Sequence, residues 1–415
     1  MVAEEPHAGD HWLVVVEEAF VPTDSGGRAE TRNFLLAAQS AGIRLHVVVP
    51  GIDDVTAHAH LLADATLRAI PRSAGWSAHL SLDPYVVVSR PLPAGLAEEL
   101  ATQHRVDPFD LIVAQTFRVA HLGIALAQRL KVPLVVRPHN VESAYFRHLA
   151  RSSTMRRSLP YLAESLKLRR TERQVHRSTV VTAFADMSVQ DADYRRSRTR
   201  TPVLHVPPVL PPDDRAGAGP GAGALESAVV LFIGSLDNAN NRDAVRWLVE
   251  QVWPLVSARR PSSALHVVGR RASSSLRELV TGVGGRLTAD APSTAPHLAQ
   301  AAMFVNPVQQ GSGVNMKVVE AMLAGLPVLS TSSGSRGLDW QPGADLLVAD
   351  TPADFAAGIV TLLEDPELRT RVGAAGQRFV RSRLDGARAI AQLQRLAGPV
   401  GVTRSHPGGG DMGLP

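Results

Sequence analysis

The stretch GSGVNMKVVEAMLAGLPVLS, residues 311–330, joins a glycine-rich loop to a segment with helical spacing. It follows the apolar run AMFVNP (302–307), which has the composition of a buried strand. Gly325 and Pro327 are the usual signals for the end of a helix. A strand, a glycine turn and a helix in this order form the repeating unit of a parallel α/β sheet, so the stretch predicts that class of fold.

The same helix carries two charged side chains, Lys317 and Glu320, one turn apart on the face that its apolar residues leave free. A helix N-terminus with a nearby lysine favours a phosphate or a diphosphate. Glu320 lies about 4.5 Å further along the axis, where a carboxylate can accept both hydroxyls of a ribose. The alternative is a surface ion pair worth less than about 1 kcal/mol. The residues alone leave both interpretations open, because a glycine-x-glycine before a helix is a weak motif.

Apolar, β-branched runs alternate with helix-length segments over most of the chain, in two sets. The first set is 11–16, 43–49, 85–88, 110–114, 132–136 and 179–184, and the second is 228–235, 263–269, 302–307, 326–331 and 345–349. Parallel sheets bind ligands beyond the carboxyl ends of their strands. We therefore predict an α/β protein with two Rossmann-like, doubly wound parallel-sheet domains that face an interdomain cleft, and we expect the site in that cleft.

The composition of the chain sets the predicted boundaries. Residues 207–228 are rich in proline, glycine and alanine and have no core pattern, which predicts a linker. The remaining predicted parts are a first domain over 1–206, a second domain over 229–385, a helix over 386–400 that can pack back on the first domain, and a disordered tail over 401–415.

Bulk composition limits the class of protein. Of the 415 residues, 45% are hydrophobic and 20% charged, which is ordinary for a soluble globular chain. The acidic N-terminus does not have the pattern of a secretory signal, and no apolar run approaches the roughly 18 residues of a spanning helix. The absence of cysteine excludes disulfides, thiolate metal sites and cysteine nucleophiles. We expect a cytoplasmic enzyme or binding protein.

Charge is concentrated between residues 145 and 200, where 13 Lys and Arg face 5 Asp and Glu, a net +8 in a chain of net +4. Met155, Leu159, Leu162 and Leu166 recur there at helical spacing and predict a long helix. A basic face of this kind attracts phosphates, anionic membrane at the inner face of the bilayer, or nucleic acid; the alternative is a solvated helical hairpin. Because no nucleic-acid motif or aromatic platform accompanies the charge, we do not expect nucleic acid as a partner.

The motif GSGVNMKVVEAMLAGLPVLSTSSGSRGLD (311–339) resembles the donor-nucleotide segment of GT-B fold glycosyltransferases, especially family 4, or "glycosyl transferases group 1". The resemblance extends in the same order to 21–37, 137–150, 231–256 and 346–369. It implies transfer of a sugar from a nucleotide diphosphate sugar to an acceptor hydroxyl or amine, with retention and with neither a metal nor another cofactor. The first domain would bind the acceptor, which is implied to be a bacterial glycan, glycolipid or natural product, and the second domain would bind the donor.

The resemblance also implies site residues. His139 and Lys317 are the implied catalytic residues, and Glu320 is the implied ribose ligand. The implied diphosphate ligands are Gly26, Gly27, Ser312, Gly313, Val314, Asn315 and Lys317; the nucleobase would lie at Ala289 and Asp290; and further phosphate or sugar contacts would come from Arg28, Ser235, Asn241 and Arg336.

Several positions depart from the family's pattern or have a plain structural alternative. Residues 24–27 also fit a simple β-turn, and a lone histidine such as His139 is often structural. Ser312 stands in place of the first glutamate of the family's Glu-x7-Glu motif, and Ser235 in place of a frequent arginine. Lys317 is therefore the main cation that we expect to contact the diphosphate. These departures leave two alternatives, a nucleotide-sugar 2-epimerase of the same fold and a catalytically degenerate subunit that binds a sugar nucleotide.

Overall fold

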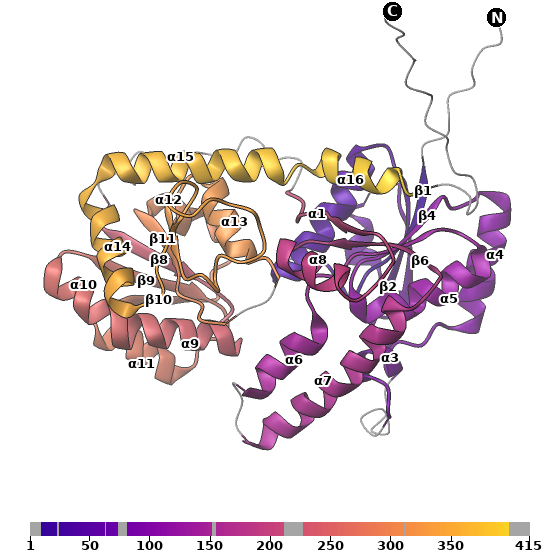
Figure 1. Ribbon diagram of the computed structural model, residues 1–415, viewed down its shortest axis with the longest axis horizontal. Helices are drawn as coiled ribbons and strands as arrows, with labels where there is room; N and C mark the ends of the chain where they lie inside the picture. The colour runs from indigo at the N-terminus through magenta and orange to yellow at the C-terminus, as the bar shows by residue number, and fades with distance from the viewer. Residues whose placement is uncertain are drawn as a thin grey trace, which may run out of the picture.

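The computed structural model describes residues 10–22, 25–62, 64–73, 81–151, 155–210, 227–310 and 313–397. Two all-parallel sheets lie side by side, and helices cover both faces of each (Figure 1). This arrangement confirms the predicted fold class, two doubly wound α/β units. Residues 211–226 of the predicted linker and the predicted tail over 401–415 lie outside the described residues.

The first sheet has seven strands in the order β3-β2-β1-β4-β5-β6-β7, so the strand order reverses between β1 and β4. Its strands are β1 (His11–Val15), β2 (Arg44–Pro50), β3 (Thr66–Ile70), β4 (Leu111–Ala114), β5 (Leu134–Val136), β6 (Val181–Asp186) and β7 (Val203–His205). The helices of this half are α1 (Gly26–Ser40), α2 (Thr56–Ala59), α3 (Tyr85–Val88), α4 (Ala94–Val106), η2 (Phe117–Val119), α5 (Ala120–Leu130), α6 (Glu142–Arg151), α7 (Met155–His176) and α8 (Val189–Arg196).

The second sheet repeats this plan with six strands in the order β10-β9-β8-β11-β12-β13, and the order reverses between β8 and β11. Its strands are β8 (Val229–Ile233), β9 (Ala264–Gly269), β10 (Arg286–Ala289), β11 (Met303–Asn306), β12 (Val328–Ser330) and β13 (Leu347–Val348). The helices of this half are α9 (Ala239–Trp247), η5 (Leu248–Val252), α10 (Trp253–Arg259), α11 (Ser274–Gly282), α12 (Ala295–Gln300), α13 (Met316–Leu323), α14 (Pro352–Glu364) and α15 (Pro366–Arg383).

The side chains of β1 alternate between the two faces of the first sheet, and each face has its own core. Trp12 and Val14 are buried in one cluster with residues of α1, while Leu13 and Val15 are buried in another with residues of α4 and α5. Successive side chains of a strand point to opposite faces, and a parallel sheet covered by helices on both sides needs both sets to be apolar. The apolar run Trp12–Val15 of β1 satisfies that need.

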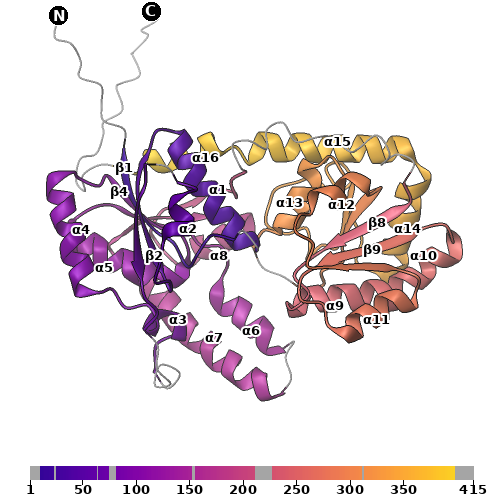
Figure 2. The same cartoon turned by 180° about the vertical axis from the view of Figure 1, so that it is seen from behind.

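The C-terminal part of the described chain returns to the first sheet. Helix α15 runs from the second half toward the first, and α16 (Gly386–Gln394) continues beyond it (Figure 2). The two helices separate where the side chain of Asp385 caps α16. A Cβ added at Gly386 would lie 2.9 Å from the Cβ of Ala37 on α1, and Ile390 and Leu393 are buried in the core of the first sheet.

One predicted strand is wrong. The run YVVV (85–88) forms the short helix α3, which begins after Pro84, and the strand at the sheet edge is β3, with the sequence TLRAI. Strand propensity alone is a weak predictor of a strand, because a β-branched run also needs a neighbouring strand with which it can pair. Here β3 pairs with β2 over its whole length, and its buried Leu67 and Ile70 are separated by partly exposed residues.

Candidate functional site

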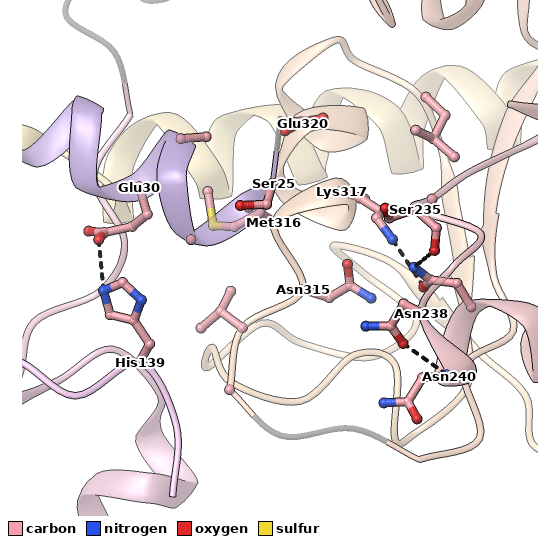
Figure 3. Close-up of a pocket in the computed structure, with 18 of the residues that line it drawn as sticks. Ser25, Glu30, His139, Ser235, Asn238, Asn240, Asn315, Met316, Lys317 and Glu320 are labelled. Carbon is pink, nitrogen blue, oxygen red and sulfur yellow. Dashed lines mark hydrogen bonds and ion pairs between the residues drawn. The ribbon is translucent and has the colours of Figure 1, made fainter. Parts of the chain in front are cut away.

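A cavity of about 850 Å³ lies between the two halves of the chain, a volume that suits a nucleotide-sized ligand (Figure 3). It is formed largely by segments that follow the carboxyl ends of strands, as expected for doubly wound sheets. The residues that line it include Glu17, Gly26, Gly27, His139 and Glu142 from the first half and Ser235, Asn241, Gly313, Lys317 and Glu320 from the second.

The N-terminal ends of α1, α9 and α13 are among the helix starts that line this cavity. The side chain of Ser25 caps α1, and that of Asn238 caps α9, in each case by accepting from a first-turn N–H. Asn315, at the N-cap position of α13, does not cap its helix; its Nδ2 instead donates to Asn306 Oδ1 at 3.1 Å. Among the described residues, no side chain therefore accepts from the first amides of α13, which lie beside the cavity at the positive end of the helix dipole and favour an anion there.

Lys317 lies at the start of α13, with its Nζ 3.0 Å from Asn241 Oδ1. A Cβ at residue 234 would lie 3.0 Å from this Nζ, so the glycine there leaves room for the ammonium group. Burial lowers the pKa of Lys317 to about 8, although Glu320 acts in the opposite direction. Because the protein only partly compensates the buried charge of Lys317, an anionic ligand would stabilise the protonated form.

His139 faces Lys317 from the other half of the chain and is held by Glu30 of α1 (Figure 3). The distance from His139 Nε2 to Glu30 Oε2 is 3.2 Å, and Glu30 Oε1 also lies 2.8 Å from Arg137 Nη1. Burial raises the pKa of Glu30, but Arg137 and His139 outweigh it and hold that pKa below its ordinary value. The ionised carboxylate therefore orients the imidazole, whose Nδ1 lies 3.8 Å from where a Cβ of Gly27 would be.

The two halves touch where they form the cavity. A Cβ at Gly313 would lie 2.5 Å from Asn140 Oδ1 and 2.7 Å from the carbonyl oxygen of His139. Gly313 also has a φ of 72°, a left-handed conformation that favours glycine. A Cβ at Gly26 would lie 3.3 Å from the Cβ of Met316. These glycines permit the close approach of α1 and the 139–140 segment to α13.

The sequence-based prediction did not include the charged groups on the first half's wall. Arg118 lies 2.7 Å from Glu17 and 2.8 Å from Glu142. Burial lowers the pKa of Arg118, but the two carboxylates outweigh it and raise that pKa, so the guanidinium stays charged. Glu17 and Arg118 follow β1 and β4, the strands at the reversal of strand order, and the folded sheet reveals that these two strands are neighbours. Arg270, after β9, adds a cation to the opposite wall.

The structure brings most of the predicted residues together. Those that line the cavity are Gly26, Gly27, His139, Ser235, Asn241, Gly313, Val314, Asn315, Lys317 and Glu320. Ser312 lies outside the described residues. The individual roles of all these residues stay predictions.

Four predicted residues are not among the described residues that line the cavity: Arg28, Ala289, Asp290 and Arg336. Arg28 instead pairs with Glu18, with Nε 3.2 Å from Oε1, and Arg336 is exposed to solvent. Asp290 follows β10 with a φ of 50° and accepts from the backbone N–H of Arg271 at 3.0 Å. The turn that it makes places residues 291–294 on the cavity wall instead.

Within the described ranges, no group of three or more His, Asp or Glu side chains is arranged to hold a metal ion. The expectation that no metal takes part stays a prediction.

Comparison with known proteins gives a sequence match in the second half of the chain. Residues 227–365 match the family described as "Glycosyl transferases group 1", which confirms the resemblance noted in the sequence. Over 141 residues, the chain is 33% identical to the GDP-mannose-dependent monoacylated alpha-(1-6)-phosphatidylinositol monomannoside mannosyltransferase of Corynebacterium glutamicum, a match of 31% of this chain and 36% of that protein. Over 185 residues, it is 30% identical to the phosphatidyl-myo-inositol mannosyltransferase of Mycobacterium tuberculosis. This match covers 41% of this chain and 47% of that protein. The chain thus spans less than half the length of these relatives.

The fold comparison extends over almost the whole chain. The structure of Anabaena HepE in complex with UDP and glucose superposes with a TM-score of 0.65, over 92% of this chain and 98% of that one, at 13% sequence identity. At that identity, the likeness shows the fold alone. It is the two-sheet GT-B fold.

Proposed function

We propose that this protein is a glycosyltransferase that moves a sugar from a nucleotide diphosphate sugar to an acceptor hydroxyl or amine. The observation that carries the proposal is the convergence of Lys317 and the N-termini of α1, α9 and α13 on one cavity between two doubly wound sheets. The match of residues 227–365 to group 1 glycosyl transferases, the mannosyltransferases among its relatives, and the UDP and glucose bound to HepE support it.

The donor would lie against the second half of the chain. Its diphosphate fits the uncapped start of α13, within reach of Lys317 and opposite the start of α1. Glu320, one turn further along α13, also lines the cavity and can accept the ribose hydroxyls. The base would then lie toward residues 291–294, and the sugar toward His139.

The chemistry follows from where negative charge appears. When the bond between the anomeric carbon and the diphosphate breaks, charge builds on the departing oxygen. Lys317 and the first amides of α13 are fixed near the proposed position of that oxygen and stabilise the charge without rearrangement. The acceptor oxygen then bonds to the anomeric carbon and releases its proton to the leaving diphosphate. With retention, the acceptor attacks from the face that the diphosphate leaves.

The first half of the chain would bind the acceptor. Arg118 pairs with Glu17 and Glu142, and these three groups offer hydrogen bonds to acceptor hydroxyls. His139, oriented by Glu30, would position the reacting groups rather than act as a nucleophile. The proposal includes a cytoplasmic bacterial enzyme that needs neither a metal nor another cofactor, and a glycan, glycolipid or natural product as acceptor.

The test is incubation of the purified chain with labelled UDP-, GDP- and dTDP-sugars, followed by separation of the products. Slow release of free sugar and nucleoside diphosphate from one donor, accelerated by an acceptor extract, is the expected result. Conversion of the donor to its 2-epimer would instead identify an epimerase. Tight binding without turnover would identify a partner subunit, and no binding of any donor would overturn the proposal.

A further inference from the structure

Helix α7 exposes a stripe of apolar side chains to solvent. Six large apolar side chains are exposed in the described ranges, and three of them lie on this one helix: Leu159 at 70%, Leu162 at 43% and Leu166 at 60%. At 3.6 residues per turn, these leucines lie on one face of α7. Single exposed leucines need no explanation, but a row of them indicates a surface that binds something.

The same face continues as a row of cations. Arg169, Arg170 and Arg173 are all exposed, and together with the three leucines they fall within an arc of about 100° that extends about 21 Å along α7. We call these six residues the α7 stripe. The opposite arc of α7, with Leu168 and Val175, is buried against the rest of the first half.

Both acidic residues of α7 are directed away from the stripe. Glu172 is buried and accepts from the backbone N–H and the hydroxyl of Ser143 on α6, at 3.0 and 2.6 Å. Glu164 accepts from the backbone N–H of Tyr85 at 2.6 Å. The α7 stripe is therefore apolar at one end and purely positive at the other.

The stripe lies on a projection of the molecule. Helices α6 and α7 form a hairpin that extends away from the first sheet in both views (Figures 1 and 2). The hairpin also reaches the cavity, because Glu142 and Tyr145 of α6 line it. The packed helices α6 and α7 therefore join the stripe directly to the wall of the cavity.

We propose that the α7 stripe is an interfacial membrane-binding surface, which lies flat on an anionic bilayer. The leucines would enter the boundary between headgroups and acyl chains, and the arginines would contact lipid phosphates. Within the described ranges, no helix is long and apolar enough to cross a bilayer, so the contact is with one leaflet. This inference does not depend on the proposed sugar transfer.

Charge distinguishes a bilayer from a second copy of the chain. A two-fold contact through the stripe would bring the arginine ends of two helices together or place them against the other copy's leucines, and neither arrangement supplies an anion. An anionic lipid surface supplies both the apolar layer that the leucines need and the phosphates that the arginines need.

The experiment is cosedimentation with vesicles made of equal parts phosphatidylglycerol and phosphatidylcholine, and with phosphatidylcholine alone. We expect binding to the mixed vesicles that weakens in about 0.5 M NaCl. The variant L159Q/L162Q/L166Q should bind more than tenfold more weakly, and R169Q/R170Q/R173Q about 100-fold more weakly, at roughly fivefold per arginine. The matched control carries Val106→Gln and Leu255→Gln, two exposed apolar residues elsewhere in the chain, and should bind like the wild type.

Two results would overturn the proposal. The first is failure of the wild type to bind the mixed vesicles, or binding by either stripe variant at the wild-type level. The second is a wild-type dimer in analytical ultracentrifugation that the leucine variant converts to a monomer, because the stripe would then be a contact between copies. Nucleotide binding by the stripe variants should equal that of the wild type, which separates this inference from the proposed function.

Discussion

Replacement of Lys317 by methionine removes a partly buried charge but keeps the aliphatic part of the side chain. In the proposed complex, the Lys317 ammonium donates to a phosphate oxygen, and a hydrogen bond to a charged group contributes about 1.5–3 kcal/mol. The dissociation constant for the nucleoside diphosphate should therefore rise by roughly 10- to 150-fold. The thermal midpoint should stay the same or increase, because the variant no longer buries a charge whose pKa is lowered to about 8 by desolvation.

The lowered pKa of Lys317 also makes the affinity depend on pH. Below pH 8, the free protein already carries the proton, and binding is at full strength. Above pH 8, binding must first restore the proton, so affinity falls as pH rises. If the diphosphate returns the pKa of Lys317 to its ordinary value, the affinity falls about tenfold between pH 7 and pH 9. At pH 8.5, binding should take up about 0.7 proton.

Isothermal titration calorimetry of the nucleoside diphosphate that binds best measures both effects. Titrations in buffers of different ionisation enthalpy give the proton uptake, and the difference between the wild type and K317M removes any contribution from titration of the nucleobase. We expect the tenfold fall in the wild type and a flat profile in K317M. The same slope in both proteins, or no proton uptake at pH 8.5, would refute the assignment of Lys317 to the diphosphate.

Three further predictions concern the residues around Lys317. Glu320→Gln should lower the affinity for a ribonucleoside diphosphate about tenfold, but leave that for its 2′,3′-dideoxy analogue unchanged; an equal loss for both ligands would exclude a ribose contact. Glu30→Gln leaves the fully buried guanidinium of Arg137 without its carboxylate, so urea denaturation should show a loss of about 3–5 kcal/mol; a loss below about 1 kcal/mol would contradict this. Gly313→Ala should push α13 away from Asn140, so turnover should fall and the radius of gyration in X-ray scattering should increase; unchanged values of both would show that the contact is dispensable.

The fold was predictable because local patterns and global topology agree over most of the chain. Residues 12–16 and 230–233 are apolar at every position, and a parallel sheet covered on both faces buries all of these side chains. The residues 85–88 show where this reasoning fails. Four β-branched or aromatic residues predict a strand locally, but β3 occupies the edge position next to β2, and 85–88 form a helix instead.

The site was predictable in the second half of the chain and less so in the first. The predicted phosphate and ribose ligands between Gly313 and Glu320 lie in one local segment, so their sequence alone groups them, and the structure places them on the cavity wall. The Arg118 network joins three segments that are far apart in the sequence, and only the folded sheet brings them together. The leucines of α7 illustrate the opposite error, because helical spacing of apolar residues predicts a helix but does not tell whether its apolar face is buried or exposed.

The most direct test of the account is a crystal structure of the chain soaked in turn with UDP, GDP and dTDP. We expect the diphosphate at the first turn of α13, within hydrogen-bond distance of Lys317 Nζ and the amides of residues 313 and 314, with the ribose against Glu320. A nucleotide bound elsewhere in the cavity, with Lys317 still bonded only to Asn241, would contradict it.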